Sequence, residues 1–409
     1  MDFDDSPEEA AFRLECRAFL DAHAEPLGDD VDLSTSYWAR PPTAEQEAEH
    51  VQACKKWQRT KFDAGWAGLT WPVEWGGRGL TPLLARVYAE EEARYDAPSG
   101  VFAQSIGMAG PTIIAAGTDE QRAELLRPML TGEHTWCQLY SEPNAGSDLA
   151  GLRTTAVRDG DEFVVNGQKV WTSGAHYADW GMLLVRTDPD QPKHRGITYL
   201  VLDMRSPGIE VRPLVQITGA AHFNEVFLTD VRVPVDNVVG EIGAGWGPTQ
   251  VTLANERQGI GDARANSFEH LIDLARYFDR ADDPGIRQQL ARVYSIQRTI
   301  EFLMYRVRTA QGRGEMPGPE SSILKLMSTQ RLAMQADMVM EIMGSAGTLV
   351  GADAHLNGYW QSLSFLGQWM SRIGGGTDEI QRNIVGERVL GLPGEPRVDK
   401  GIPFRDIPG

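Results

Sequence analysis

The chain has 409 residues, of which 42% are hydrophobic and 23% charged, so it can form two or three globular domains and is not a disordered protein. Its formal net charge of −18 excludes binding to nucleic acid or to an anionic membrane through overall charge, although a local basic patch could hold a phosphate. Because no apolar run reaches the ~18 residues of a membrane span and the first residues are acidic, we expect a cytoplasmic protein without membrane insertion.

Residues 1–135 have the spacing of an all-α N-terminal domain. Residues 6–9, Ser-Pro-Glu-Glu, predict the start of a helix, because they offer a side-chain cap, a proline at the first helical position and the glutamate of a capping box. Further helices are predicted over residues 82–95 and, capped by Asp119, up to residue 130. The first helix should bury one apolar face, formed by Phe12, Cys16, Phe19 and Leu20.

Residues 136–240 change to β-branched side chains and short turns, which are typical of a compact β domain. Asp159-Gly160 and Asn166-Gly167 favour the positive backbone angles of tight hairpin turns. Strands are predicted over residues 154–158, 162–165, 168–172, 182–186, 197–204, 209–215 and 225–233.

Residues 241–409 return to helical spacing and predict a C-terminal domain like a four-helix bundle. The order of helices, β domain and helices indicates an α+β multidomain fold. The predicted helices cover 246–278 with a break or two near the glycines, 285–310, 322–345, and a last stretch from Thr377 to just before Gly391.

The three cysteines, Cys16, Cys54 and Cys137, lie far apart and match no metal-binding spacing. A disulfide framework or a zinc site is therefore not expected. We interpret all three as reduced, buried thiols, and we expect no metal.

Three segments carry a specific resemblance. Residues 137–148 read Cys-Gln-Leu-Tyr-Ser-Glu-Pro-Asn-Ala-Gly-Ser-Asp, residues 166–173 read Asn-Gly-Gln-Lys-Val-Trp-Thr-Ser, and residues 375–382 read Gly-Gly-Thr-Asp-Glu-Ile-Gln-Arg. In this order the chain resembles the FAD-dependent acyl-CoA dehydrogenases. The resemblance covers nearly the whole chain and implies an N-terminal all-α domain, a central β-barrel-like domain and a C-terminal four-helix bundle.

The resemblance implies where the flavin of FAD would lie. Ser141 and the backbone of Gln138, Leu139 and Tyr140 would bind the polar edge of the ring. Gly146 would let the backbone approach closely, and Ser147 would lie between flavin and substrate. Trp171 would cover one face of the ring, Ser173 would reach the region of N5, and Thr172 between them would also contact the cofactor.

The reaction needs a carboxylate that removes the proton next to the thioester carbonyl. Many relatives carry this glutamate on a loop where the present chain has Gly375. A second branch carries it on a long helix before an arginine, which matches Glu256 and Arg257. We interpret Glu256 as the base and the Gly375 backbone N–H as a donor to the carbonyl. Arg257 would either shape the edge of the substrate pocket or form a structural pair. The alternative for Glu256 is a solvated or ion-paired helix residue.

Two segments that would meet the FAD pyrophosphate depart from the family pattern. The usual Arg-x-x-Phe-Gly reads Arg276-Tyr-Phe-Asp, and a Gln-x-x-Gly-Gly stretch begins with Glu341. A carboxylate near two phosphates is repulsive, so the contacts between subunits are rearranged or FAD is held in only some subunits. Thr377 and Glu379 match the segment near the adenine.

The resemblance implies oxidation of an acyl-CoA to the trans-2-enoyl-CoA, with Glu256 as base, FAD N5 as hydride acceptor and electron-transferring flavoprotein as electron acceptor. It also implies a homotetramer or a hetero-oligomer with a related chain. Two alternatives are a non-catalytic or half-site subunit of a hetero-oligomer and a flavin monooxygenase or oxidase. The acyl group is not determined, but Gly107, Ala109 and Gly110 indicate room for bulk.

Overall fold

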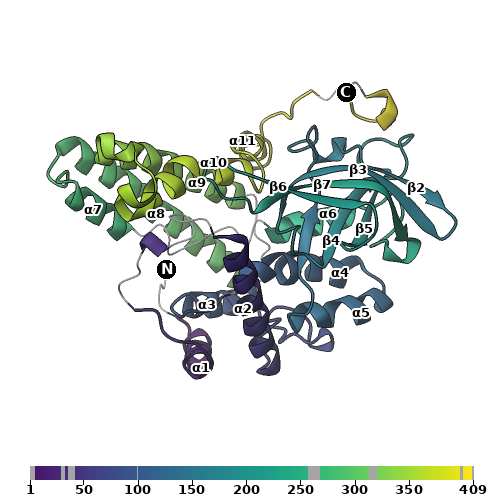
Figure 1. Cartoon of the computed structure of the whole chain (residues 1–409), viewed down its shortest axis with the longest axis horizontal. Coiled ribbons are helices and arrows are strands. Elements are labelled where there is room, and N and C mark those ends of the chain that lie inside the picture. Colours follow the sequence, from purple (N-terminus) through teal and green to yellow (C-terminus); the bar gives the residue numbers. More distant parts are fainter. Residues whose placement is uncertain are drawn as a thin grey trace. The chain divides into compact units, whose positions relative to one another are not determined.

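The computed structural model describes residues 5–28, 33–35, 42–98, 100–256, 268–312, 320–396 and 399–407 (Figure 1). The chain forms two compact units, each built from segments that are distant in the sequence. Unit 1 comprises Met1–Thr43, Pro82–Asp96 and Ile260–Glu395, and unit 2 comprises Ala44–Thr81, Ala97–Gly259 and Pro396–Gly409. The helices before residue 136 are thus divided between the units, and the boundaries at 135/136 and 240/241 remain a prediction.

Unit 1 is helical and has its own apolar core, in which Leu271, Leu290, Val339 and Trp360 are buried. The described part of the chain contains no helix long and apolar enough to cross a membrane. The helices of unit 1 are α1 (Pro7–His23), α3 (Pro82–Glu92), α7 (Phe268–Tyr277), α8 (Pro284–Gly312), α9 (Glu320–Met343), α10 (Gln368–Ile373) and α11 (Asp378–Ile384).

The predicted ends of the helices agree best with the structure where the sequence carries a strong local capping signal. In α1 the Ser6 hydroxyl accepts from the Glu9 N–H and the Glu9 carboxylate accepts from the Ser6 N–H, so the capping box is confirmed. The assignment of Asp119 as a cap is wrong, because Thr118 caps α5 (Asp119–Leu130) in a second capping box with Gln121. The predicted helix over 246–278 appears as α6 (Trp246–Glu256) and α7, and its predicted interior falls outside the described residues.

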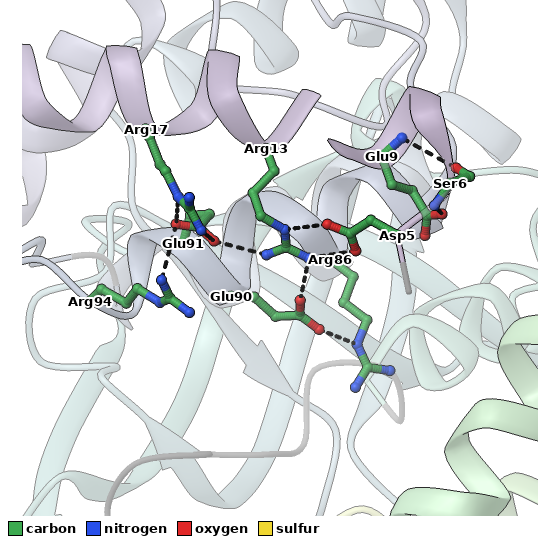
Figure 2. Close-up of polar contacts among 9 residues, drawn as sticks. All are labelled: Asp5, Ser6, Glu9, Arg13, Arg17, Arg86, Glu90, Glu91 and Arg94. Atoms are coloured by element: carbon green, nitrogen blue, oxygen red, sulfur yellow. Dashed lines mark hydrogen bonds and ion pairs between the residues drawn. The ribbon is translucent and has the colours of Figure 1, made fainter. Parts of the chain in front are cut away.

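A buried carboxylate joins α1 to α3 (Figure 2). The Glu91 side chain is 1% exposed and accepts hydrogen bonds from Arg13 at 2.8 Å and from Arg17 at 2.8 Å. Arg94 lies 3.7 Å from the same carboxylate. Burial alone would raise the pKa of Glu91, but the hydrogen bonds from Arg17 and Arg13 outweigh it and hold the pKa below its usual value.

We expect Glu91→Gln to loosen α1 from α3 and to lower the free energy of unfolding by about 2 kcal/mol, since the three charge-assisted hydrogen bonds from Arg13 and Arg17 weaken. Because the folded pKa lies below the unfolded one, this stabilisation is complete above about pH 4.3 and is lost as the pH falls through the folded pKa. Hydrogen exchange of the α1 amides at pH 7 and at pH 3 measures this stabilisation. Glu90→Gln, at the more exposed neighbour bonded to Arg13, is the control, and equal protection of α1 in both variants would contradict the expectation.

Unit 2 is a curled sheet with helices against one face (Figure 1). Its helices are α2 (Ala44–Asp63), α4 (Gly110–Ala116), α5 and α6. The seven strands of the sheet in the described residues are β1 (Trp136–Leu139), β2 (Thr155–Asp159), β3 (Glu162–Ser173), β4 (Trp180–Arg186), β5 (Ile197–Asp203), β6 (Ile209–Leu214) and β7 (Phe223–Pro234).

The order of the strands places β4 beside three others. β1 runs parallel to the first half of β4, β2 meets its last residue Arg186, and β5 pairs along its other edge. From β2 the sheet continues antiparallel through β3 and β7 to β6. One face buries Tyr140, Tyr199 and the helices α4 and α5, and the other buries Leu139, Val226 and Leu228 inside the curl.

The hairpin predicted at Asp159-Gly160 is confirmed, since β2 and β3 pair across it. The turn predicted at Asn166-Gly167 is wrong, because β3 continues through it with an irregular register against β7. A Cβ on Gly167 would lie 2.3 Å from the Thr154 hydroxyl oxygen, so this glycine is required by close packing rather than by a turn. Asn166 instead bonds Asp230 through its side chain, with an N···O distance of 3.0 Å.

Candidate functional site

The first strand of the sheet presents polar side chains to α6. In β1 alternate residues point to opposite faces, so Trp136, Gln138 and Tyr140 share the face covered by helices while Leu139 lies in the curl. This places the Gln138 amide between two buried aromatic rings, in a strand that leads directly into the turn beginning at Ser141.

The α6 helix turns a row of polar residues toward this face. Thr249 and Thr252 are buried at spacings of seven and four residues before Glu256, so all three lie on one side of the helix. The Gln138 side-chain N–H donates to a Glu256 carboxylate oxygen at 3.3 Å. The carboxylate predicted as the base therefore contacts the strand that enters the predicted flavin turn.

A buried polar cluster extends from this contact. Thr252 lies 2.8 Å from the Thr112 hydroxyl and 3.4 Å from the Tyr199 hydroxyl. The Tyr140 ring packs edge-on against Tyr199, and its hydroxyl is buried with no hydrogen-bond partner within the described part of the chain. Burial, Tyr199 and the nearby Glu256 charge raise the pKa of Tyr140 well above its usual value, so its phenol is neutral at physiological pH.

The turn after β1 is held by a buried ion pair that the sequence interpretation did not include. Lys169 on β3 is fully buried and donates to the Tyr140 carbonyl at 3.1 Å and to a Glu142 carboxylate oxygen at 2.8 Å. The backbone N–H groups of Arg153 and Thr154 donate to the same carboxylate at 2.6 and 2.8 Å. Burial alone would raise the pKa of Glu142, but Lys169 and these donors outweigh it and lower that pKa.

Trp171 presents a flat apolar surface next to this turn. Its side chain is 60% exposed and its φ is +62°, in an irregular part of β3 where the register against β7 shifts. The Phe223 ring supports it edge-on at 5.9 Å. A strained backbone that exposes a large indole is a feature of binding sites rather than of packing.

These residues fit the isoalloxazine ring of FAD. The buried Thr172 hydroxyl has no hydrogen-bond partner among the described residues, and the Ser141 carbonyl ties the turn to β3 by accepting from the Val170 N–H at 2.9 Å. A Cβ on Gly146 would meet nothing within 4 Å, so packing within the chain does not require that glycine. Ser147 is exposed on the same turn, and Ser173 ends β3 two residues after Trp171.

The other predicted site residues lie in unit 1 or outside the described residues. Gly375 has a φ of +64°, and its carbonyl accepts from the Gln381 side chain at 3.2 Å. Thr377 caps α11, whose exposed Glu379 pairs with Arg382. Arg276 is exposed and pairs with Asp273, and Arg257 lies outside the described residues.

The glycines taken as a sign of room for bulk need correction. A Cβ on Gly110 would lie 1.9 Å from the Trp71 ring, and Ala109 is fully buried in the same core. These two small residues make space for Trp71 and not for an acyl group. Only at Gly107 would an added Cβ meet nothing within 4 Å.

Comparisons with known proteins identify the family. The acyl-CoA dehydrogenase N-terminal domain matches residues 6–133, the middle domain matches residues 137–231 and the C-terminal domain matches residues 243–390. Acyl-CoA dehydrogenase IpdE1 of Mycobacterium tuberculosis is 41% identical over 357 residues, which cover 86% of this chain and 91% of that protein.

Two solved structures resemble the chain over nearly its whole length. The Tcur3481-Tcur3483 steroid ACAD matches with a TM-score of 0.80 and 31% identity over 97% of this chain and 100% of that chain. The ChsE4-ChsE5 complex from Mycobacterium tuberculosis matches with a TM-score of 0.77 and 32% identity over the same shares. The chain therefore belongs to the acyl-CoA dehydrogenase family and is an acyl-CoA dehydrogenase, a flavoprotein oxidoreductase of lipid metabolism.

Proposed function

We propose that the chain oxidises a CoA thioester to the trans-2-enoyl thioester and that Glu256 removes the α proton. The observation that carries this proposal is the contact of Glu256 with Gln138, at the strand that leads into the Ser141–Ser147 turn. A general base must lie near the substrate and have its charge controlled by its neighbours. The half-buried Glu256, next to a neutral phenol and an amide donor, meets both conditions.

The replacement of the loop glutamate supports this assignment. Gly375 has no side chain that could act as a base, so another carboxylate must do so if the family reaction occurs. The roles of Gly375 as a carbonyl donor and of Arg257 at the pocket edge remain predictions from the resemblance.

FAD would supply the oxidising power, accepting the β hydrogen as hydride at N5. Ser141, Gly146 and the backbone of Gln138–Tyr140 would bind the edge of its ring. Trp171 and Phe223 would exclude water from one face, and Thr172 and Ser173 would donate near N5. Arg276, Thr377 and Glu379 are proposed for the rest of FAD on the resemblance alone.

The substrate we propose carries a bulky ring system. The support comes from the steroid ACAD that matches 97% of this chain at 31% identity. Anaerobic mixing of the FAD-loaded protein with a series of acyl-CoAs, from short linear chains to steroid side chains, tests both reaction and substrate. Rapid loss of the flavin absorbance with steroid thioesters is the expected result; no loss with any thioester would contradict the proposed reaction.

A second candidate is a half-site subunit in a hetero-oligomer with a related chain. Arg276 forms an exposed ion pair with Asp273, and Glu341 would face phosphate if it occupied the family position. The ChsE4-ChsE5 complex is itself a structure of two named chains. One FAD per chain in the purified homo-oligomer would exclude this candidate, whereas FAD that rises only after a sister chain is added would favour it.

Electron-transferring flavoprotein is the acceptor that we propose. Reduced enzyme should pass electrons to this flavoprotein rapidly and react slowly with oxygen. Fast reaction with oxygen in a stopped-flow experiment would instead favour the oxidase or monooxygenase alternative.

Removing the amide that bonds the base should change the pH dependence of catalysis. A hydrogen bond to a carboxylate favours its charged form, so Gln138→Leu should raise the pKa of Glu256 and move the rising limb of the pH–rate profile to higher pH. The loss of one charge-assisted bond predicts a roughly 10- to 100-fold fall in the flavin reduction rate at pH values on the acid side of that limb, and a smaller fall above it.

The matched control is Gln168→Leu, because Gln168 donates to Glu225 at 2.9 Å in the same sheet, between β3 and β7. That variant should keep the wild-type profile. If Gln138→Leu also keeps it, Gln138 does not position the base.

A further inference from the structure

A cavity in unit 2, of about 590 Å³, has an unusual lining for an acidic protein. Its walls come from β2, the end of β4 and the segment near the C-terminus. No aspartate or glutamate is among the described residues that line it. Four of its lining residues are arginines, namely Arg153, Arg158, Arg186 and Arg405.

Arg186 is a buried cation whose hydrogen bonds go to neutral carbonyl groups. It is 3% exposed and donates to the Lys193 carbonyl at 2.7 Å and the Ala150 carbonyl at 2.6 Å. Its Nε is buried and has no hydrogen-bond partner within the described ranges. Burial lowers the pKa of Arg186 to about 10, so it stays charged at neutral pH.

Two of these arginines contact a phenylalanine ring of the C-terminal segment. The Arg186 guanidinium lies 3.8 Å from the Phe404 ring centre, and that of Arg153 lies 5.3 Å from it. The Phe404 N–H donates to the Gln191 carbonyl at 2.9 Å, which fixes this wall. Arg153 repels Arg186, and the carboxylates of Glu142, Asp148 and Asp188 attract it. An anion that contacts both guanidinium groups beside the ring would further stabilise the two charges.

We propose that this cavity binds a phosphomonoester group of an organic anion. Guanidinium groups bind phosphate oxygens in pairs, and the volume lies within the range of small-molecule sites. Arg405 is paired with Asp190, and the Nε of Arg158 donates to the Gly160 carbonyl. Arg186 keeps an Nε–H without a partner in the described residues, and Arg153 stacks on the same phenylalanine ring, so we assign the phosphate to Arg153 and to the Nε–H of Arg186.

The same chemistry has two possible sources: the 3′-phosphate of a CoA thioester, which rests on the proposed function, or a free phosphate ester. The first is supported by the chain order, because Arg186 donates to the carbonyl of Ala150, three residues after the Ser141–Ser147 turn. It is also supported by β4, in which Leu183, three residues before Arg186, pairs with Leu139 of β1.

Isothermal titration of the purified oligomer with adenosine 3′,5′-bisphosphate and with inorganic phosphate tests the site. Arg153 is exposed, so Arg153→Gln should fold and should weaken binding of the bisphosphate by on the order of 10-fold. Arg212→Gln is the matched control, since Arg212 is also an exposed arginine over a phenylalanine ring, Phe227, at 4.5 Å. Equal affinity in wild type and Arg153→Gln would overturn the proposal.

A second arm distinguishes the two sources. If the phosphate belongs to the substrate, the bisphosphate should compete with acyl-CoA. Removal of the 3′-phosphate from the thioester should then raise KM in wild type and not in Arg153→Gln, with the limiting rate of flavin reduction unchanged. Binding of the bisphosphate that depends on Arg153 without this competition assigns the cavity to a free phosphate ester. The titration measures binding and needs no turnover. Its result can therefore be interpreted even if the protein does not catalyse the proposed dehydrogenation.

Discussion

Glu256→Gln should remove most of the flavin reduction by acyl-CoA, with a fall of about 10²- to 10⁴-fold, the contribution expected of a general base. Glutamine keeps the size of the side chain and can still contact Gln138, so the helix and the turn should remain intact. FAD content should be unchanged, because Glu256 is not among the residues proposed to hold the ring. Anaerobic stopped-flow absorbance at saturating substrate measures the rate.

The control for this substitution is Glu225→Gln on β7. Glu225 accepts a hydrogen bond from the Gln168 amide, as Glu256 accepts one from Gln138, but it lies on the strand pair β3–β7. The control should reduce flavin at the wild-type rate. A Glu256→Gln variant as fast as this control would assign the α proton to another group.

Lys169→Met should be the most destabilising substitution in unit 2. It leaves the Glu142 carboxylate buried without its cation and frees the Tyr140 carbonyl, and removal of one partner of a buried ion pair costs about 3–5 kcal/mol. The turn from Ser141 to Ser147 should lose its geometry, so FAD retention should fall as well. Thermal unfolding and FAD release on gel filtration measure the two effects.

Replacing both partners separates the charge effect from the packing effect. In Lys169→Met with Glu142→Gln no uncompensated charge remains, and the amide oxygen of glutamine can still accept from one of the two N–H groups, of Arg153 and Thr154, that donate to different carboxylate oxygens. Part of the stability should return. Arg232→Met, at an exposed ion pair with Asp159 and Glu162, is the control and should show no measurable change. A single Lys169→Met variant as stable as this control would show that the ion pair does not hold the turn.

The elements that could be predicted from the sequence are those that depend on residues close to each other along the chain. The capping box at Ser6, the buried face of α1 and the hairpin at Asp159-Gly160 each depend on residues within one turn of each other, and all three are confirmed. The three cysteines are buried free thiols, as expected.

The parts that could not be predicted depend on contacts between distant segments. Gly167 has the sequence of a turn but is required by Thr154, and Gly110 is required by Trp71, neither of which is a neighbour in sequence. The division of the N-terminal helices between two units likewise follows packing and not chain order.

The residues of the candidate site could be predicted only in part from the sequence. The motif placed Gln138 and Tyr140 near the flavin through their backbone, whereas their side chains turn toward α6. The sequence did contain a signal for these side-chain directions. Side chains alternate between the two faces of a strand, so Gln138 and Tyr140 of this segment must share the face of Trp136. Lys169 also had a signal, because a lone charge within a predicted strand needs a partner, but Glu142 lies 27 residues away in sequence.

The central claim is that Glu256 lies against the carbon from which the proton is removed. A crystal structure of the FAD-loaded protein with a non-reducible acyl-CoA analogue tests it most directly. We expect a Glu256 carboxylate oxygen about 3–3.5 Å from the α carbon, the distance of a reactive pair. A bound analogue whose α carbon faces a different carboxylate, with Glu256 turned away from it, would contradict the account.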